Sequence, residues 1–402
     1  MKPSLHEKTI LILGSRLMQL PAICKAKEMG LQVITIDPDE KALGFKYADH
    51  SYIHDLADEK SCLKIAKKHN VNGVMTLAAD YPIPMVSRIC KDLSLRGLTT
   101  EAAILSTNKK IMRQAFSARN IPSPIAITAM SFDEAKNAIK QLSFPIIFKP
   151  AISHGGQGVT QISAESNIDE IERAYIRAMS ITSGDGILVE EFVEGPEFSV
   201  EAVTVNKVTH IVALTDKLTS GPPYFVELGH NQPSLYPDID KQLLLKTAIL
   251  GIKALGIDWS ASHTEIKLSS NGPKIIEIGA RLGGGFVTTQ LVPFSTGVDM
   301  VKAAILIALG EEPTIRSTCQ QGAAIRFLYT QPGIIKNIYG VKSAEKTPGV
   351  REVDVYKRVG DKSTPLVDGT GRLGHVISVA KNAKSAIICA EQAQKKIVID
   401  TI

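Results

Sequence analysis

The sequence contains no long apolar run. Its most apolar stretches, TILILG at the N-terminus and AAILIALG before Glu311, fall far short of the roughly 20 residues that a membrane-spanning helix needs. Arg16 follows the first stretch almost at once, which excludes a signal-peptide core. The sequence therefore predicts a chain that does not cross a membrane.

Closely spaced cysteines are also missing. The five cysteines are odd in number, lie far apart and form no C-x-x-C pair; they are Cys24, Cys62, Cys90, Cys319 and Cys389. This spacing excludes a disulfide framework and a zinc site, and it is typical of reduced thiols in a cytoplasmic protein.

Charge of one sign is nowhere concentrated. The formal net charge of +5 is spread along the chain, without a block of like charges or a basic stretch interleaved with aromatic residues. Nucleic acid is therefore not expected as a partner, whereas a small anionic ligand is compatible with the charge.

The length and the order of elements predict a multidomain α/β protein. A chain of 402 residues exceeds what one hydrophobic core usually serves. The opening KTILILGSRLMQLPAICKAKEMGLQVITIDPD reads as a β-α-β unit, and VNGVMTL adds a strand, so an open parallel sheet is expected over the first hundred residues. Asp37 lies at the right distance for a dinucleotide ribose, but GSRLMQ lacks the G-x-G-x-x-G fingerprint, which favours a structural unit.

Beyond Asn120 the pattern changes to strands and helices of a second unit. Its clearest elements are a buried strand FPIIFKP, a long strand pair that turns near Asn206, and an amphipathic helix over 240–256. The last ninety or so residues are β-rich and close with an apolar-periodic helix expected over 383–398.

A predicted hairpin, HTEIKLSSNGPKIIEIGA, carries two glutamates. If pairing is symmetric about Asn271, Glu265 lies opposite Glu277. Like charges in that relation are destabilising, so either one is protonated or a cation such as Mg²⁺ or Mn²⁺ lies between them. Strict alternation places Ile275, Glu277 and Arg281 on one face and Ile276 on the other. An exposed strand face with ordinary surface charges is the alternative.

Two further segments carry candidate ligand-binding groups. In FPIIFKPAISHGGQGV a strand ends at Lys149 and continues into a glycine loop, a pattern that brings backbone N–H groups and an ammonium close to phosphate oxygens. The lysine precedes the glycines, so this is not the P-loop, and a flexible hairpin tip is the alternative. The segment ILVEEFVEGPEFSVE has many carboxylates for so apolar a strand, and a solvated strand edge is the alternative there.

The order of these motifs resembles the ATP-grasp superfamily. TNK at 107–109, the strand lysine, the glycine loop, EEFVEGPEFSVE and a hairpin ending in E-x-G-x-R follow one another over roughly Thr107 to Leu309. The resemblance implies an α/β ATP-grasp fold. Its parts would be an N-terminal open parallel-sheet (pre-ATP-grasp) domain over 1–110, an ATP-grasp domain over 111–310 with a small mobile lid at about 122–190, and a β-rich C-terminal α+β domain over 311–402.

The resemblance also implies a nucleotide site for ATP. Lys109 and Lys149 would hold phosphates under a closing glycine loop, Glu190, Glu191 and Val193 would form the adenine hinge, and Glu197 would bind ribose. The full implied set is Lys109, Lys149, His154, Gly155, Gly156, Gly158, Glu190, Glu191, Val193 and Glu197.

Three more residues match the catalytic and metal-binding positions of that superfamily. Glu265 and Glu277 match the two magnesium-binding glutamates, and Arg281 matches the arginine that steadies the substrate carboxylate and the transferred phosphate. With Lys149, Glu277 and Arg281 form the expected catalytic set. Many relatives carry asparagine two residues after the second glutamate, and here Gly279 stands there, which puts a second metal ligand in doubt.

Similar enzymes activate a carboxylate as an acyl phosphate that an amine captures, releasing ADP and phosphate. VELGHNQP together with EIGARLGGG is most similar to the L-amino-acid ligase branch, which makes dipeptides. The candidate substrate residues are Glu227, His230, Arg281, Gly283, Gly284 and Gly285, the glycines leaving room for an acceptor.

Other readings of the segment and of the chain remain open. The segment that holds Glu227 and His230 reads alternatively as a surface loop with incidental charges. The C-terminal GRLGHVISVAKNAKSAIICAEQAQKKI is similar to biotin carboxylase and the purine-pathway ligases, so an enzyme acting on a phosphoribosyl amine is an alternative. A non-catalytic nucleotide-binding protein is another. Dimerisation is common among similar proteins, but no stretch of this sequence identifies an interface.

Overall fold

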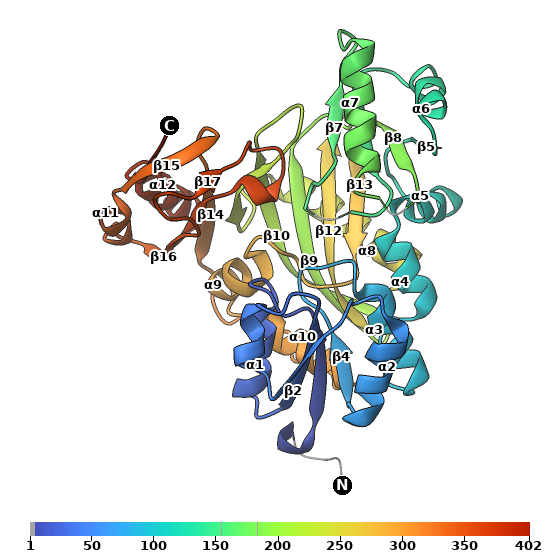
Figure 1. The fold of residues 1–402 in the computed structure, drawn as a ribbon, viewed down its shortest axis with the longest axis vertical. Coiled ribbons are helices and arrows are strands. Elements are labelled where there is room, and N and C mark those ends of the chain that lie inside the picture. The colour runs from blue at the N-terminus through green and yellow to red at the C-terminus, as the bar shows by residue number, and fades with distance from the viewer. Residues whose placement is uncertain (1–4, 154, 183) are drawn as a thin grey trace.

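The first hundred residues form a four-stranded parallel sheet. The computed structural model describes residues 5–153, 155–182 and 184–402. The sheet has the order β3-β2-β1-β4 and lies at one end of the molecule (Figure 1). Its elements are η1 (Leu5–Glu7), β1 (Thr9–Leu13), α1 (Leu20–Glu28), β2 (Gln32–Asp37), η2 (Leu43–Lys46), β3 (His50–Ile53), α2 (Glu59–Lys68), β4 (Gly73–Met75) and α3 (Ile83–Asp92). The predicted β-α-β unit and open parallel sheet are therefore confirmed.

The carboxylate of Asp37 accepts hydrogen bonds from residues of the turn that follows β1. One comes from the backbone N–H of Ser15 at 2.8 Å and another from the Arg16 side chain at 3.3 Å. The side chain thus fixes the turn after β1, in agreement with the structural interpretation of this segment.

A second, antiparallel sheet lies in the segment predicted as the lid, and we call it the lid sheet. Two short helices, α4 (Thr100–Thr107) and α5 (Lys109–Ala118), lead from the first sheet to it. The lid sheet has the order β5-β8-β6-β7 and projects at the opposite end of the molecule, with α6 and α7 beside it (Figure 1). Its elements are β5 (Ala126–Ala129), α6 (Phe132–Ile139), β6 (Ile146–Pro150), β7 (Thr160–Ile162), α7 (Ile168–Met179) and β8 (Ile187–Glu191).

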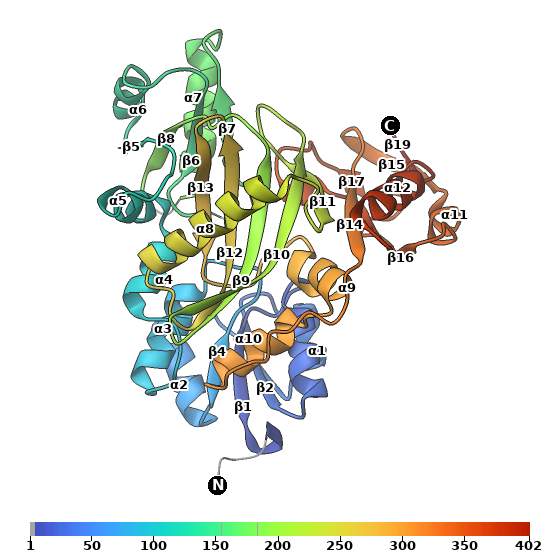
Figure 2. The same cartoon turned by 180° about the vertical axis from the view of Figure 1, so that it is seen from behind.

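The largest sheet has eight strands and runs through the middle of the molecule. Its order is β13-β12-β9-β10-β11-β14-β18-β16, with α8 lying along one face (Figure 2). The strands and the helix are β9 (Glu197–Val205), β10 (Val208–Thr219), β11 (Glu227–Gln232), α8 (Asp238–Ala254), β12 (Ser260–Ser269), β13 (Gly272–Gly279), β14 (Gly322–Leu328), β16 (Val350–Val355) and β18 (Gly374–Ala380). Strands on both sides of residue 310 thus share one sheet, and the division into three domains stays a prediction.

The remaining elements surround the end of this sheet. A three-stranded sheet of order β17-β15-β19 lies beside it at the C-terminus. The elements are η3 (Val287–Leu291), α9 (Val292–Thr296), α10 (Met300–Ala308), β15 (Gly333–Tyr339), α11 (Val341–Glu345), β17 (Lys362–Ser363), η4 (Gly369–Gly371), α12 (Ala383–Gln394) and β19 (Val398–Thr401). The closing helix is shorter than expected: it ends at Gln394, and Val398, its last predicted residue, begins β19, which pairs with β15.

No single helix in the described ranges is long and apolar enough to cross a membrane. Two consecutive helical segments, Val287–Thr296 and Met300–Ala308, are together long and apolar enough for a membrane span, but a bend of 118° separates them.

The glutamate hairpin has the predicted pairing for a different reason. Glu265 lies opposite Glu277, but the register shifts between Glu265 and Ile266, so that one extra residue, Ile276, is inserted. A bulge of this kind breaks strict alternation. Ile275 consequently lies in the core and Ile276 lines a cavity together with Glu277, which corrects the predicted faces of these two isoleucines.

Candidate active site

Two cavities meet between the lid, the large sheet and the C-terminal region. We call them the lid cavity, of about 150 Å³, which is lined by Lys149, Gly156 and Val193 among others, and the glycine cavity, of about 450 Å³, which is lined by Gly284, Gly285 and His230 among others. They share the lining residues Gly155, Glu227, Glu265, Glu277 and Arg372. The two hairpin glutamates therefore lie at the junction of two spaces that can hold small molecules.

The TNK motif positions the first lysine of the lid cavity. Asn108 caps α5 by accepting hydrogen bonds from the backbone N–H groups of Lys110 and Ile111. Lys109 begins the helix, and its ammonium lies 3.0 Å from Glu277 Oε2 and donates to the Ser153 carbonyl at 2.9 Å. A helix cap thus aims this ammonium at the hairpin.

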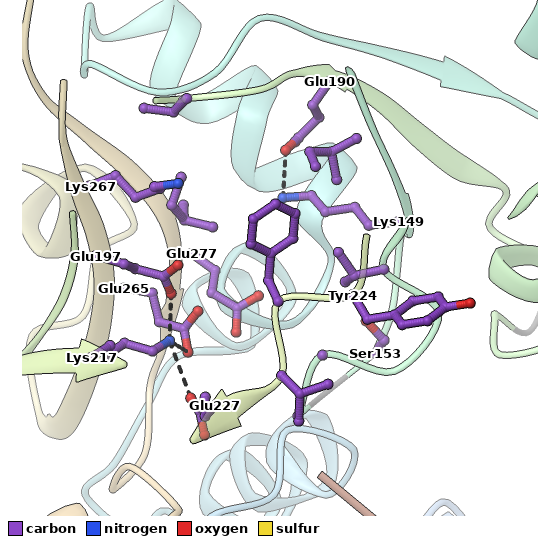
Figure 3. Close-up of a pocket in the computed structure, with 18 of the residues that line it drawn as sticks. Lys149, Ser153, Glu190, Glu197, Lys217, Tyr224, Glu227, Glu265, Lys267 and Glu277 are labelled. Carbon is purple, nitrogen blue, oxygen red and sulfur yellow. Dashed lines mark ion pairs between the residues drawn. The ribbon is translucent and has the colours of Figure 1, made fainter. Parts of the chain in front are cut away.

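Lys149 reaches the same cavity from the end of β6. Its Nζ lies 2.6 Å from Glu190 Oε2 (Figure 3). The other carboxylate oxygen of Glu190 lies 2.9 Å from Arg113 Nε. Burial lowers the pKa of Lys149 to about 8, although Glu190 opposes that shift. The carboxylate of Glu190 is therefore engaged by two cations, whereas the sequence analysis assigned this residue to the adenine hinge.

The glycine loop after β6 leaves open space above these lysines. Gly155 and Gly156 have φ values of +61° and +73°, and a Cβ at either would meet nothing within 4 Å. Gly158 also has positive φ, but a Cβ there would lie 2.6 Å from the Pro150 ring. The first two glycines thus leave room beside the cavity and the third packs against the lid. His154 lies outside the described residues.

Lys217 lies at the centre of a carboxylate cluster. Its ammonium is 2.6 Å from Glu197, 2.9 Å from Glu265 and 3.2 Å from Glu227 (Figure 3). The four residues come from four strands that are neighbours in the large sheet: β9, β10, β11 and β12. Burial alone would lower the pKa of Lys217, but these carboxylates hold it well above its ordinary value. The cluster is therefore charged and mutually compensated.

The hairpin glutamates fit a divalent cation. Burial would raise the pKa of Glu265, but Lys217 and His263 hold it below its ordinary value, so this carboxylate is ionised. Within the described residues no group of three or more His, Cys, Asp or Glu is arranged to hold a metal by itself. Mg²⁺ usually uses one or two carboxylates and completes its shell with substrate phosphates and water, which two glutamates beside a phosphate-sized cavity allow.

Arg281 is fixed by the N-terminal sheet. Its Nε and Nη2 bond the two carboxylate oxygens of Asp80 at 2.8 and 2.7 Å. A Cβ at Gly279 would lie 3.0 Å from Asp80 Oδ1 and 3.1 Å from Arg281 Cζ. This crowding explains why glycine stands where many similar proteins have asparagine: a larger side chain would displace the Arg281–Asp80 pair.

The glycine cavity collects the remaining candidate residues. His230 is buried, and Nε2 lies 3.7 Å from Glu227 Oε2. Within the described part of the chain neither of its ring nitrogens has a hydrogen-bond partner. A Cβ at Gly285 would approach this nitrogen to 3.1 Å. Gly283 packs instead against His263 and Glu201, so its missing side chain makes room for that pair and not for the cavity.

Most of the predicted residues therefore line the two cavities. Beyond His154, the predicted residues that line neither are Gly158 and Gly283. Two further residues of the site were not predicted from the sequence. Arg113 forms an ion pair with Glu190. Arg372 lies 2.9 Å from Glu227 Oε2, and its guanidinium lies 3.9 Å from the centre of the Phe327 ring. Arg372 belongs to the GRLGHV motif, so that motif was the available signal, but nothing in it indicated which residue it would contact.

Two family models match the chain. The ATP-grasp domain model matches residues 142–290, and the model of L-amino acid ligase C-terminal domain 2 matches residues 326–401. The first covers the lid sheet from β6 to β8 and the strands β9 to β13, and the second covers the segments that carry Tyr356, Lys357 and Arg372 into the glycine cavity.

Relatives and solved structures agree with these matches. Alanine–anticapsin ligase from Bacillus subtilis is 26% identical over 64% of this chain. The match covers 59% of that relative, so this chain spans less than two thirds of the relative's length. An L-amino acid ligase from Bacillus licheniformis has a TM-score of 0.85 at 21% identity, over 98% of this chain and 99% of that one. A phosphoribosylglycinamide synthetase from Anaerococcus prevotii has a TM-score of 0.76 at 25% identity, over 98% and 100%.

With this fold and these motifs, the chain is an ATP-grasp ligase, whose cofactors are ATP and Mg²⁺ or Mn²⁺. Within that class it is most similar to the L-amino acid ligases, because the model of their C-terminal domain 2 matches residues 326–401. The predicted fold class is confirmed, including the N-terminal parallel sheet and the β-rich C-terminal region.

Proposed function

We propose that the protein joins two L-amino acids into a dipeptide, converting ATP to ADP and phosphate. The observation that carries this proposal is the composition of the glycine cavity. Tyr356, Lys357 and Arg372, from the region that matches the L-amino acid ligase C-terminal domain, close a space that also contains Glu227 and His230. An amino acid needs a partner for its ammonium, and Glu227 with the neighbouring ring of His230 offers one.

The reaction would proceed where the two cavities meet. The carboxylate of the first amino acid attacks the γ-phosphate of ATP, forming an acyl phosphate and releasing ADP. The amine of the second then forms the C–N bond while the bond from the acyl carbon to the phosphate oxygen breaks, so that phosphate and one proton leave. Lys109 and Lys149 would neutralise phosphate charge, and Arg281 would orient the reacting carboxylate.

Glu265 and Glu277 would hold the divalent cation at this junction. A bound Mg²⁺ neutralises phosphate charge and orients the phosphate for in-line attack. The Gly155–Gly156 segment lines the boundary of the site and would exclude water, which otherwise hydrolyses an acyl phosphate.

The lowered pKa of Lys149 makes a prediction about pH. Below about 8 its ammonium is present to meet ATP phosphates, and above that value the neutral amine predominates. We therefore expect kcat/KM for ATP to fall as pH rises through about 8 in the wild type. Lys149→Arg keeps its charge over the same range and should remove this fall, whatever its absolute rate. A wild-type profile that stays flat from about pH 7 to 9.5 would contradict the assignment.

The proposal is tested by phosphate release from ATP and Mg²⁺ across single and paired L-amino acids. Release that requires particular pairs, together with the mass of the corresponding dipeptide, is expected. If no amino acid supports phosphate release, but aminoimidazole ribonucleotide or another ribose-phosphate amine does, the proposal is overturned in favour of the purine-type alternative. The similarity to the Anaerococcus synthetase supports that alternative. ATP binding without any turnover would favour the non-catalytic alternative.

A further inference from the structure

Lys357 is a cation in the glycine cavity whose charge no neighbouring carboxylate compensates. Three basic side chains with long stems line this cavity: Arg281, Lys357 and Arg372. Arg281 is held by Asp80, and Arg372 lies 2.9 Å from Glu227. The half-buried Lys357 forms no ion pair with any carboxylate in the described ranges. A cation inside a cavity without such a partner is available to bind an anionic group of a ligand.

Tyr356, the residue before Lys357, anchors this part of the chain. Tyr356 donates its backbone N–H to the Leu373 carbonyl at 2.8 Å, and its hydroxyl lies 2.7 Å from His375 Nδ1. His375 is fully buried, lies 3.0 Å from Glu352 through Nε2, and packs against the Phe286 ring at 4.3 Å. These contacts, which centre on the buried His375, hold the residue that precedes Lys357 at the end of the strand.

The chemistry of amide formation supplies the anionic group. When two amino acids are joined, the donor's carboxylate is consumed at the junction near Glu265 and Glu277, whereas the acceptor keeps its own. That free carboxylate must lie in the glycine cavity beyond the reacting amine. Of the two guanidinium groups there, Arg281 is assigned to the carboxylate of the donor and Arg372 is paired with Glu227. Leaving a carboxylate there without a cation would be unfavourable.

We propose that Lys357 binds the free α-carboxylate of the amine substrate. The second substrate is then an amino acid or a peptide and not a simple amine. This inference rests on the proposed dipeptide synthesis and adds to it the group that selects the acceptor. Lys357 contacts no reacting atom in this scheme, so it determines affinity for the acceptor and not activation of the donor.

The test separates donor activation from acceptor binding. Hydroxylamine captures an acyl phosphate without needing a second amino acid, so a panel of L-amino acids with ATP, Mg²⁺ and hydroxylamine identifies donors by the hydroxamate formed. The acceptor is then supplied as an L-amino acid or as the corresponding amide, which has the same side chain but no carboxylate. Lys357→Met and Lys357→Arg are compared with Arg358→Met, which removes an exposed neighbouring cation that lines neither cavity.

We expect Lys357→Met to raise KM for the amino-acid acceptor about 10- to 100-fold, as loss of a charged hydrogen bond does, and to leave KM for the amide unchanged. Hydroxamate formation should stay at the wild-type rate, Lys357→Arg should restore part of the affinity, and Arg358→Met should have no effect. Because an amide also alters the acidity of the amine, the comparison between variant and wild type isolates the carboxylate.

Two results would overturn the inference or its basis, and they are distinguishable. If Lys357→Met raises KM equally for the amino acid and the amide, or for neither, the carboxylate does not bind there. If no amino acid gives a hydroxamate with the wild type, the proposed dipeptide synthesis itself is wrong.

Discussion

Glu277→Gln is expected to lower the rate of ATP-dependent phosphate release more than about a hundredfold while the protein stays folded. Glutamine has nearly the same shape but no charge, so the hairpin would keep one carboxylate, Glu265, for a divalent cation. Lys109, which lies 3.0 Å from Glu277, would keep its bond to the Ser153 carbonyl. The loss should therefore be in turnover and not in folding.

The measurement is a phosphate-release assay at saturating ATP and Mg²⁺, combined with thermal unfolding. Glu194→Gln is a matched control, because Glu194 is exposed, lies on the segment that leads out of β8, and lines neither cavity. The control should retain the wild-type rate. Activity within a few-fold of the wild type in Glu277→Gln would refute the metal assignment.

Lys217→Met is expected to have the largest effect on stability. The substitution leaves Glu197, Glu227 and Glu265 around one point without the ammonium that compensates them. Removal of one partner from a buried ionic cluster typically destabilises by about 3–5 kcal/mol, because the remaining charges stay desolvated. A chain that still folds should also lose turnover, since Glu227 and Glu265 line both cavities.

Denaturant unfolding, with the midpoint converted to a free energy of unfolding, measures this effect. Lys67→Met is the control, because Lys67 pairs at 2.7 Å with Asp92 on the surface and 56% of its side chain is exposed. A surface pair of this kind contributes less than about 1 kcal/mol. Equal losses in the two variants would show that the cluster around Lys217 is not a compensated charge centre.

Local patterns in the sequence predicted the parts of the site that lie within one segment. The strand that ends at Lys149, the glycine loop and the hairpin are each continuous, so periodicity and turn residues were sufficient to place them. The bulge at Ile276 was not predictable, because the turn residues leave the exact pairing open. The C-terminal helix was predicted about one turn too long: it ends at Gln394, and Val398 belongs to β19, whose pairing with β15 no local pattern indicated.

Partnerships between distant segments could not be read from any local pattern. Asp80 bonds Arg281 across 201 residues of chain, and Glu190 bonds Arg113 across 77. An isolated aspartate or arginine in a sequence carries no signal of its partner, because alternation and helical periodicity describe only which face a residue occupies.

The sequence by itself determined the order of the motifs, and through their resemblance to a known superfamily the class of fold. The pairing of Glu265 with Glu277 was predicted, but it depends on the bulge at Ile276, which the turn residues did not show. Only the tertiary structure decided which charges compensate which. It brought Lys217 among carboxylates from three neighbouring strands, fixed Arg281 against the N-terminal sheet, and directed Lys357 and Arg372 from the C-terminal region into the glycine cavity. Compensation of buried charge depends on distances that exist only after the sheets are assembled.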